Sequence, residues 1–91
     1  MNADEARAIT LEALHAANPW LEPMMRPAHA AIKAAAARAQ QRAVRDPTPA
    51  DVPDDRRMTV HIALRLEGYS VLADVLEGDE IGMADTFTIS W

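Results

Sequence analysis

Apolar and polar positions along the chain divide it into a helical first half and a strand-rich end. Residues 3–17 place Ile9, Leu11 and Leu14, together with two alanines, on an apolar side at helical spacing. Asn2 can cap this segment, and two acids follow in the first turn, where the helix dipole favours them. We therefore predict a first helix over 3–17.

A second helix is predicted over residues 27–45. Pro27 suits the first position of a helix, and the alanine, lysine, arginine and glutamine residues that follow are strong helix formers. On such a helix, Arg38, Arg42 and Arg45 fall on one stripe. The proline-rich segment after residue 45 ends the helix.

Residues 56–67 fit two different elements. Apolar residues alternate from Met58 to Leu66, which is a strand pattern, and a tight turn at Glu67-Gly68 would pair this strand with the next segment. Acidic residues at 54 and 55 and a glycine at 68 instead suit the two ends of a helix. On a helix, however, the apolar residues split between two sides. The residues leave both interpretations open.

The end of the chain predicts a hairpin. Residues 69–76 are strand-like, and residues 85–91 form a strand with apolar side chains on one side and hydroxyls on the other. The acidic segment 77–84 between them, with its two glycines, is the predicted loop. The fold class is therefore α+β, with N-terminal helices packed on one face of a small C-terminal antiparallel β-sheet. It has either three helices plus a hairpin or two helices plus a three-stranded meander.

The chain of 91 residues is the size of one small domain, residues 1–91. It consists of a helical part at 3–45, a proline-rich connector at 46–55 and a C-terminal part at 56–91. Large core-forming residues are scarce beside the alanines. A partner or a sister subunit would therefore add useful buried area.

The stretch Asn18–Pro27, NPWLEPMMRP, carries prolines at 19, 23 and 27. An interior proline removes a backbone donor and costs a helix about 3 kcal/mol, so the stretch predicts a joint between two helices. Its large apolar residues either plug the end of the domain's own core or form a docking surface for a partner. They are Trp20, Leu21, Met24 and Met25.

The formal net charge of −5 argues against general nucleic-acid binding. Residues 26–46 are locally basic, with five bases and one acid. The stripe of Arg38, Arg42 and Arg45 is the candidate for an anionic contact, although no aromatic residues are interleaved with it for base stacking. In the simpler interpretation, it is a solvated helix face that pairs with the acidic connector.

No pattern of chemistry-bearing residues predicts an enzyme. The chain has no cysteine, and its histidines, at 15, 29 and 61, lack the spacing of a metal site. We interpret His15 and His29 as solvated helix positions, and His61 as lying on the polar face of a strand or the flank of a helix. The acids cluster in predicted loops, and the glycines form no phosphate-binding pattern. We expect no catalytic residue, no metal and no cofactor.

Four short motifs give the chain a family resemblance. EARAIT, AIKAAA, ALRLEGYSV and TFTISW occur in this order, and the chain resembles a group of small uncharacterised tailed-phage proteins that end in Ile-Ser-Trp. The resemblance implies a helix over 52–67, ended by Gly68, with Tyr69 opening a strand. The chain departs from the group in its early prolines and in lacking a glycine after the second helix.

The expected function is that of a non-enzymatic phage protein that acts by protein–protein docking, as a minor virion structural or decoration component. The alternative is a host-takeover or anti-defence inhibitor that binds a bacterial target or a small anionic ligand. Expected partners are other protein subunits, in a homo-oligomer or with virion or host proteins. No membrane partner is expected, because the apolar runs are short and a signal peptide is lacking. The expected location is the bacterial host cytoplasm or, after incorporation, the virion.

Overall fold

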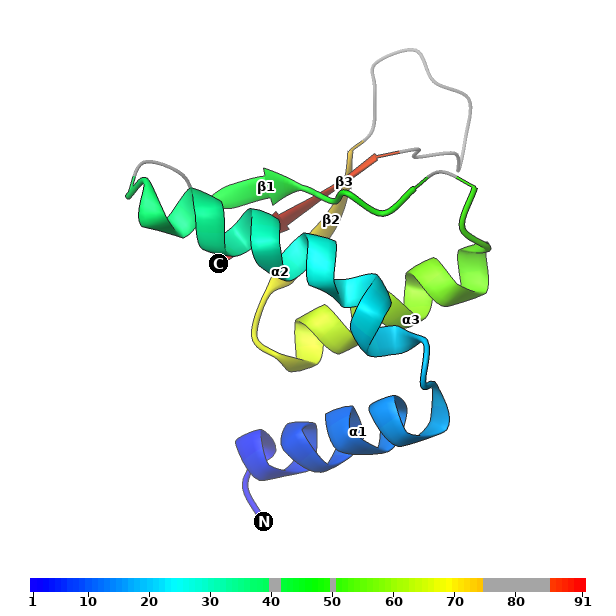
Figure 1. Ribbon diagram of the computed structural model, residues 1–91. Coiled ribbons are helices and arrows are strands. Elements are labelled where there is room, and N and C mark those ends of the chain that lie inside the picture. Colours follow the sequence, from blue (N-terminus) through cyan, green and yellow to red (C-terminus); the bar gives the residue numbers. More distant parts are fainter. Residues whose placement is uncertain (40–41, 50, 75–85) are drawn as a thin grey trace.

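The computed structural model describes residues 1–39, 42–49, 51–74 and 86–91. These residues form three helices and three strands (Figure 1). Their order is α1 (Ala3–Ala17), α2 (Leu21–Ala37), β1 (Ala43–Arg45), α3 (Asp54–Leu66), β2 (Ser70–Asp74) and β3 (Thr86–Ser90). The predicted α+β class is confirmed. The predicted hairpin loop at 77–84 lies outside the described residues.

The sheet is antiparallel, with the strand order β1–β3–β2. Val44, Ile89 and Val71 lie in one row across it and point to the face that the helices cover. Three helices are present, as in the first of the two predicted arrangements. The predicted hairpin of β2 and β3 gains a third strand, β1, which comes from the segment between α2 and α3.

Residues 54–66 form a helix, as the capping residues predicted, and the strand alternative is wrong. Val60, Ala63 and Leu64 are buried at helical spacing. The helix ends in a Schellman motif, in which Gly68 N–H donates to Arg65 O at 3.0 Å and Tyr69 N–H donates to Leu64 O at 3.1 Å. This turn directs the chain from α3 into β2.

Replacing Gly68 with alanine is expected to lower the free energy of unfolding by about 1–2 kcal/mol. Gly68 has φ of +106°, and an added Cβ would meet no atom within 4 Å, so the cost comes from backbone strain and not from a clash. Urea denaturation would measure the change. Gly68→Asn is the control, and it should cost less because asparagine tolerates positive φ. Equal stability of Gly68→Ala and the parent would contradict the assignment.

The predicted second helix, 27–45, is shifted in the structure. α2 begins at Leu21 and ends at Ala37. Pro23 lies in its first turn, where a backbone N–H has no acceptor within the helix, while Pro27 is an interior proline. The helix continues through both because its buried residues keep helical spacing. Burial of each large side chain contributes about 1.5–3 kcal/mol, which offsets the proline.

The end of the predicted second helix is a strand instead. The backbone turns at Ala39, which has φ of 56°, and residues 43–45 then pair with β3. Local sequence favours a helix here, but pairing with β3 satisfies the backbone and places Val44 beside Ile89. The helical part at 3–45 therefore contains a strand at its end.

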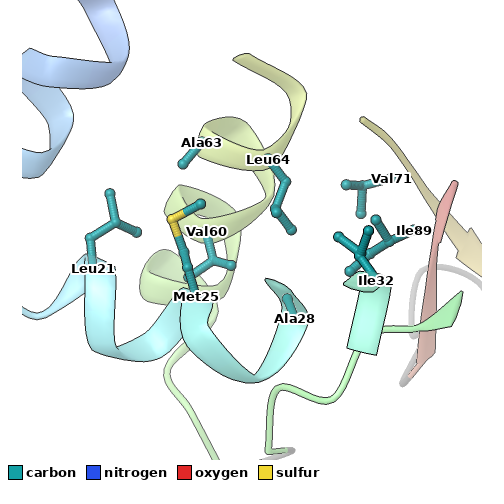
Figure 2. Close-up of a cluster of buried hydrophobic side chains, with 9 residues drawn as sticks. All are labelled: Leu21, Met25, Ala28, Ile32, Val60, Ala63, Leu64, Val71 and Ile89. Carbon is teal, nitrogen blue, oxygen red and sulfur yellow. The ribbon is translucent and has the colours of Figure 1, made fainter. Parts of the chain in front are cut away.

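The core lies between the sheet and the pair α2 and α3 (Figure 2). Its buried residues are Leu21, Met25, Ala28 and Ile32 from α2, Val60, Ala63 and Leu64 from α3, and Val71 and Ile89 from the sheet. α1 lies on the far side of α2 and α3, and it contacts those two helices but none of the described strands (Figure 1).

The first helix is confirmed, but its apolar residues divide between two sides. Asn2 caps it as predicted, by accepting a hydrogen bond from Glu5 N–H at 2.8 Å. Leu11 and Leu14 pack against the core, whereas Ile9 is 54% exposed. Among the helices in the described part of the chain, none is long and apolar enough to cross a bilayer.

Candidate functional site

An apolar strip runs along the outer face of α3. Met58 and Ile62 lie one turn apart and are 62% and 40% exposed. Since a helix advances by about 100° per residue, this face lies opposite the buried face of Val60 and Leu64. Arg65 follows on the same side, three residues after Ile62. The strip is thus the second of the two apolar sides that these residues have when they form a helix.

At Arg65, the strip reaches the outer edge of the sheet at β2, because the Arg65 guanidinium donates to Val71 O. On the β1 side of β3, Asp46 N–H donates to Phe87 O at 2.8 Å and Trp91 N–H donates to Arg42 O at 3.0 Å. In an antiparallel sheet, the backbone groups of successive residues in a central strand point to opposite neighbouring strands. Because Phe87 bonds on the β1 side, the even-numbered residues of β3 bond to β2. The residues of β2 opposite Phe87 and Ile89 therefore point their backbone groups outward.

Those residues of β2 are Val71 and Ala73. One side chain of α3 reaches this edge: Arg65 Nη2 donates to Val71 O at 3.0 Å. No strand in the described part of the structure pairs with this side of β2. On the face of the sheet that the described helices leave uncovered, Leu72 is 65% exposed. We call this surface the β2–α3 edge, defined by Met58, Ile62, Arg65, Leu72 and the backbones of Val71 and Ala73.

Charges at the two ends of α3 differ in sign. Asp54 and Asp55 occupy its first turn, where the helix dipole favours acids, and Arg65 lies in its last turn, where it favours bases. All three residues are exposed. The exposed face of α3 therefore has an acidic end, an apolar centre and a basic end.

The four apolar residues predicted as a partner-binding surface lie largely inside the domain. Leu21 and Met25 are fully buried in the core (Figure 2). Trp20 and Met24 are half-buried and pack against that core. The Arg56 guanidinium lies 5.0 Å from the centre of the Trp20 ring, which is a cation–π distance. This placement favours the interpretation as a core plug, and a partner contact by Trp20 or Met24 stays a prediction.

The three arginines of the predicted stripe do not share a helix. Arg38 is the C-cap of α2, Arg42 precedes β1 and Arg45 lies within β1. All are exposed, and no salt bridge joins them to a carboxylate in the described residues. The expected pairing of this stripe with the acidic connector is therefore not seen there. An anionic contact by these arginines stays a prediction, without the helical geometry that suggested it.

The connector is instead held by a buried pair, Asp46 and His61. Their side chains are only 3% and 6% exposed, and His61 Nε2 lies 2.7 Å from Asp46 Oδ2. The other carboxylate oxygen accepts from the Thr48 hydroxyl at 2.6 Å and from Thr48 N–H at 3.0 Å. The His61 ring lies 4.4 Å from the ring of Phe87, measured between centroids. His61 lies on a helix and not on a strand, and it is buried against the connector and Phe87.

Burial by itself would raise the pKa of Asp46. Hydrogen bonds from His61 and Thr48, together with the charge interaction with His61, outweigh burial and lower the pKa of this carboxyl. The pair joins the connector to α3 and to β3, and Arg57 adds a hydrogen bond to Pro49 O at 2.8 Å. We therefore interpret this cluster as a structural contact that holds the connector against α3 and β3.

The other two histidines lie on helices as predicted. His29 Nε2, on α2, is 2.9 Å from Glu67 Oε1 at the end of α3, and its side chain is partly exposed. In the described residues, no group of three or more His, Asp or Glu side chains could hold a metal ion.

No protein-family model matches this chain, and neither does any curated protein sequence or solved structure. The resemblance to small tailed-phage proteins therefore stays a prediction.

Proposed function

We propose that the protein acts by docking another polypeptide chain at the β2–α3 edge. The observation that carries this proposal is the combination of three exposed large apolar side chains, Met58, Ile62 and Leu72, around one edge of the sheet. Large exposed apolar side chains at a sheet edge are typical of interaction sites. A docked chain pairs with the free backbone N–H and C=O groups of the edge and removes the apolar surface from water.

An extended segment of a partner fits this surface. Its backbone would bond to the outward N–H and C=O groups of Val71 and Ala73, in the manner of strand addition. Successive side chains of a strand point to opposite faces. One set would therefore lie beside Leu72 on the uncovered face of the sheet, and the other set would contact Met58 and Ile62 on α3.

The resemblance to tailed-phage proteins extends the proposal to a biological setting. In that setting, the chain is a minor virion structural or decoration component, and its docking edge joins it to other virion subunits. Mass spectrometry of purified particles tests this role, and consistent absence of the chain from virions would exclude it.

The alternative is an inhibitor that uses the same edge to bind and block a bacterial protein. The exposed apolar edge supports both roles equally. Recovery of a stoichiometric host protein with the chain, from cells without virions, would favour the inhibitor.

A photo-crosslinking amino acid placed at residue 72 is expected to form adducts with a second polypeptide. The control places the same group at Ile9, which has similar exposure but lies on α1, outside the β2–α3 edge. Ile62→Glu should reduce the adducts from residue 72 by about tenfold or more, because it buries a charge against the docked chain. The yield is measured by denaturing electrophoresis and mass spectrometry.

The change Ile9→Glu controls for the added charge and should leave the adducts unchanged. Equal adduct formation from residues 9 and 72, or adducts that Ile62→Glu does not reduce, would contradict docking at this edge.

A further inference from the structure

We infer that the chain docked at the β2–α3 edge is a second copy of the same chain, related to the first by a two-fold axis. The inference rests on the proposed docking function and names its partner. A two-fold interface uses the same surface on both copies, so that surface must be complementary to itself when it is turned around. Three features of the edge meet this condition.

The first feature is the order of charges and apolar residues along α3. When two copies of α3 lie antiparallel, Met58 of one copy meets the partner's Ile62, and the partner's Met58 meets Ile62. The same alignment brings Asp55 against the partner's Arg65 at both ends of the contact. The apolar centre is covered, and the exposed Asp55 of each copy meets a base of the other.

The second feature is the register of β2. If Leu72 lies opposite the partner's Leu72, Val71 lies opposite the partner's Ala73. Val71 and Ala73 are the residues whose backbone groups point outward, so both pairs can exchange hydrogen bonds across the edge. The two exposed leucine side chains then cover each other on the same face of an enlarged sheet.

The third feature is that one axis serves both contacts. The motif at Gly68 joins the end of α3 directly to the start of β2. From Tyr69 to Leu72, a strand advances about 10 Å, at about 3.3 Å per residue. From Leu66 back to Val60, midway between Met58 and Ile62, a helix spans about 9 Å, at about 1.5 Å per residue. The centres of the two contacts therefore lie at a similar level along the edge.

Arg65 can act in both contacts. Its guanidinium uses one nitrogen to donate to Val71 O and carries further donors. The remaining N–H groups are available to a carboxylate of the partner, which favours Asp55. A carbonyl oxygen accepts two hydrogen bonds, so Val71 O can retain Arg65 while it accepts a bond from the partner's strand.

Sedimentation equilibrium of the full chain, from about 1 μM to about 1 mM, tests the inference. The parent chain should shift from monomer to dimer with concentration. Asp55→Arg and Arg65→Asp should each weaken the dimer by about tenfold or more, since each places like charges against one another twice. An equimolar mixture of the two variants should recover the dimer, because every contact then joins opposite charges. Recovery on mixing also shows that both variants fold.

The matched control is Glu12→Arg, which makes the same charge change on an exposed residue of α1 and should leave the dimer unchanged. A parent that stays monomeric throughout would overturn the two-fold inference. So would a dimer that neither charge variant weakens, or variants that fail to recover on mixing. Crosslinks from residue 72 to a different protein, with a monomeric parent, would overturn the second copy as partner and leave the docking function standing. Absence of both crosslinks and dimer would overturn both.

Discussion

Replacing Asp46 with alanine is expected to lower the free energy of unfolding by about 3–5 kcal/mol. The change leaves His61 buried without its acceptor and removes the oxygen that accepts two hydrogen bonds from Thr48. Breaking one partner of a buried pair costs more than the pair contributes, because the other polar group remains out of water. Urea denaturation followed by circular dichroism measures the change.

Asp51→Ala is the matched control, because Asp51 lies in the same connector and is exposed. Its effect should stay within about 0.5 kcal/mol, as for most surface substitutions. If the two variants lose equal stability, the hydrogen bonds of Asp46 with His61 and Thr48 do not stabilise the fold as the structure indicates.

The same pair predicts how stability depends on pH. The pKa of Asp46 is lower in the folded chain than its ordinary value. A carboxyl with a lowered folded pKa stabilises the fold above its unfolded pKa, about 3.9, and this contribution is lost as the pH falls through the folded pKa. The difference in stability between the parent and Asp46→Asn should therefore narrow below about pH 4, while carboxyls common to both cancel.

Elements specified by local signals were predictable from the sequence. The acids at 54 and 55 and Gly68 mark the two ends of α3, and the structure uses each for that purpose. The strand pattern at 85–91 gives β3 in the same way. In each case, the signal lies within the element or next to it.

Elements specified by distant contacts were not predictable. Residues 43–45 have no strand signal of their own, and they form β1 because their backbone pairs with β3. Asp46 and His61 are 15 residues apart, and they meet only when α3 packs beside the connector. The Asp-Pro-Thr sequence does carry one local signal, since an aspartate often bonds to the backbone two residues later.

The candidate docking surface follows from a feature that counted against the correct helix. Apolar residues on both sides of residues 54–66 favour a strand when each apolar residue is expected in the core. In the structure, Val60 and Leu64 occupy the core, and Met58 and Ile62 remain outside. The second apolar side is then a candidate interface and no longer an objection to the helix.

Replacing Leu64 with alanine is expected to lower the free energy of unfolding by about 2–5 kcal/mol, the range for large-to-small substitutions in a core. Leu64 is fully buried among α2, α3 and the sheet (Figure 2). Alanine keeps the helix and the backbone carbonyl that accepts from Tyr69 N–H, so the loss isolates side-chain packing. A small domain has a total stability of about 5–15 kcal/mol, so this change removes a large share of it.

The control for that experiment is Leu72→Ala, the same chemical change at a side chain that is mostly exposed. Measured at a dilution that keeps the chain monomeric, Leu72→Ala should cost no more than about 1 kcal/mol, the full span of strand propensities. Comparison of the two leucine variants thus distinguishes a side chain of the core from a side chain of the β2–α3 edge. If Leu72→Ala destabilised the dilute chain as much as Leu64→Ala, residue 72 would be part of the monomer's own packing, and the edge would not be free to dock a partner.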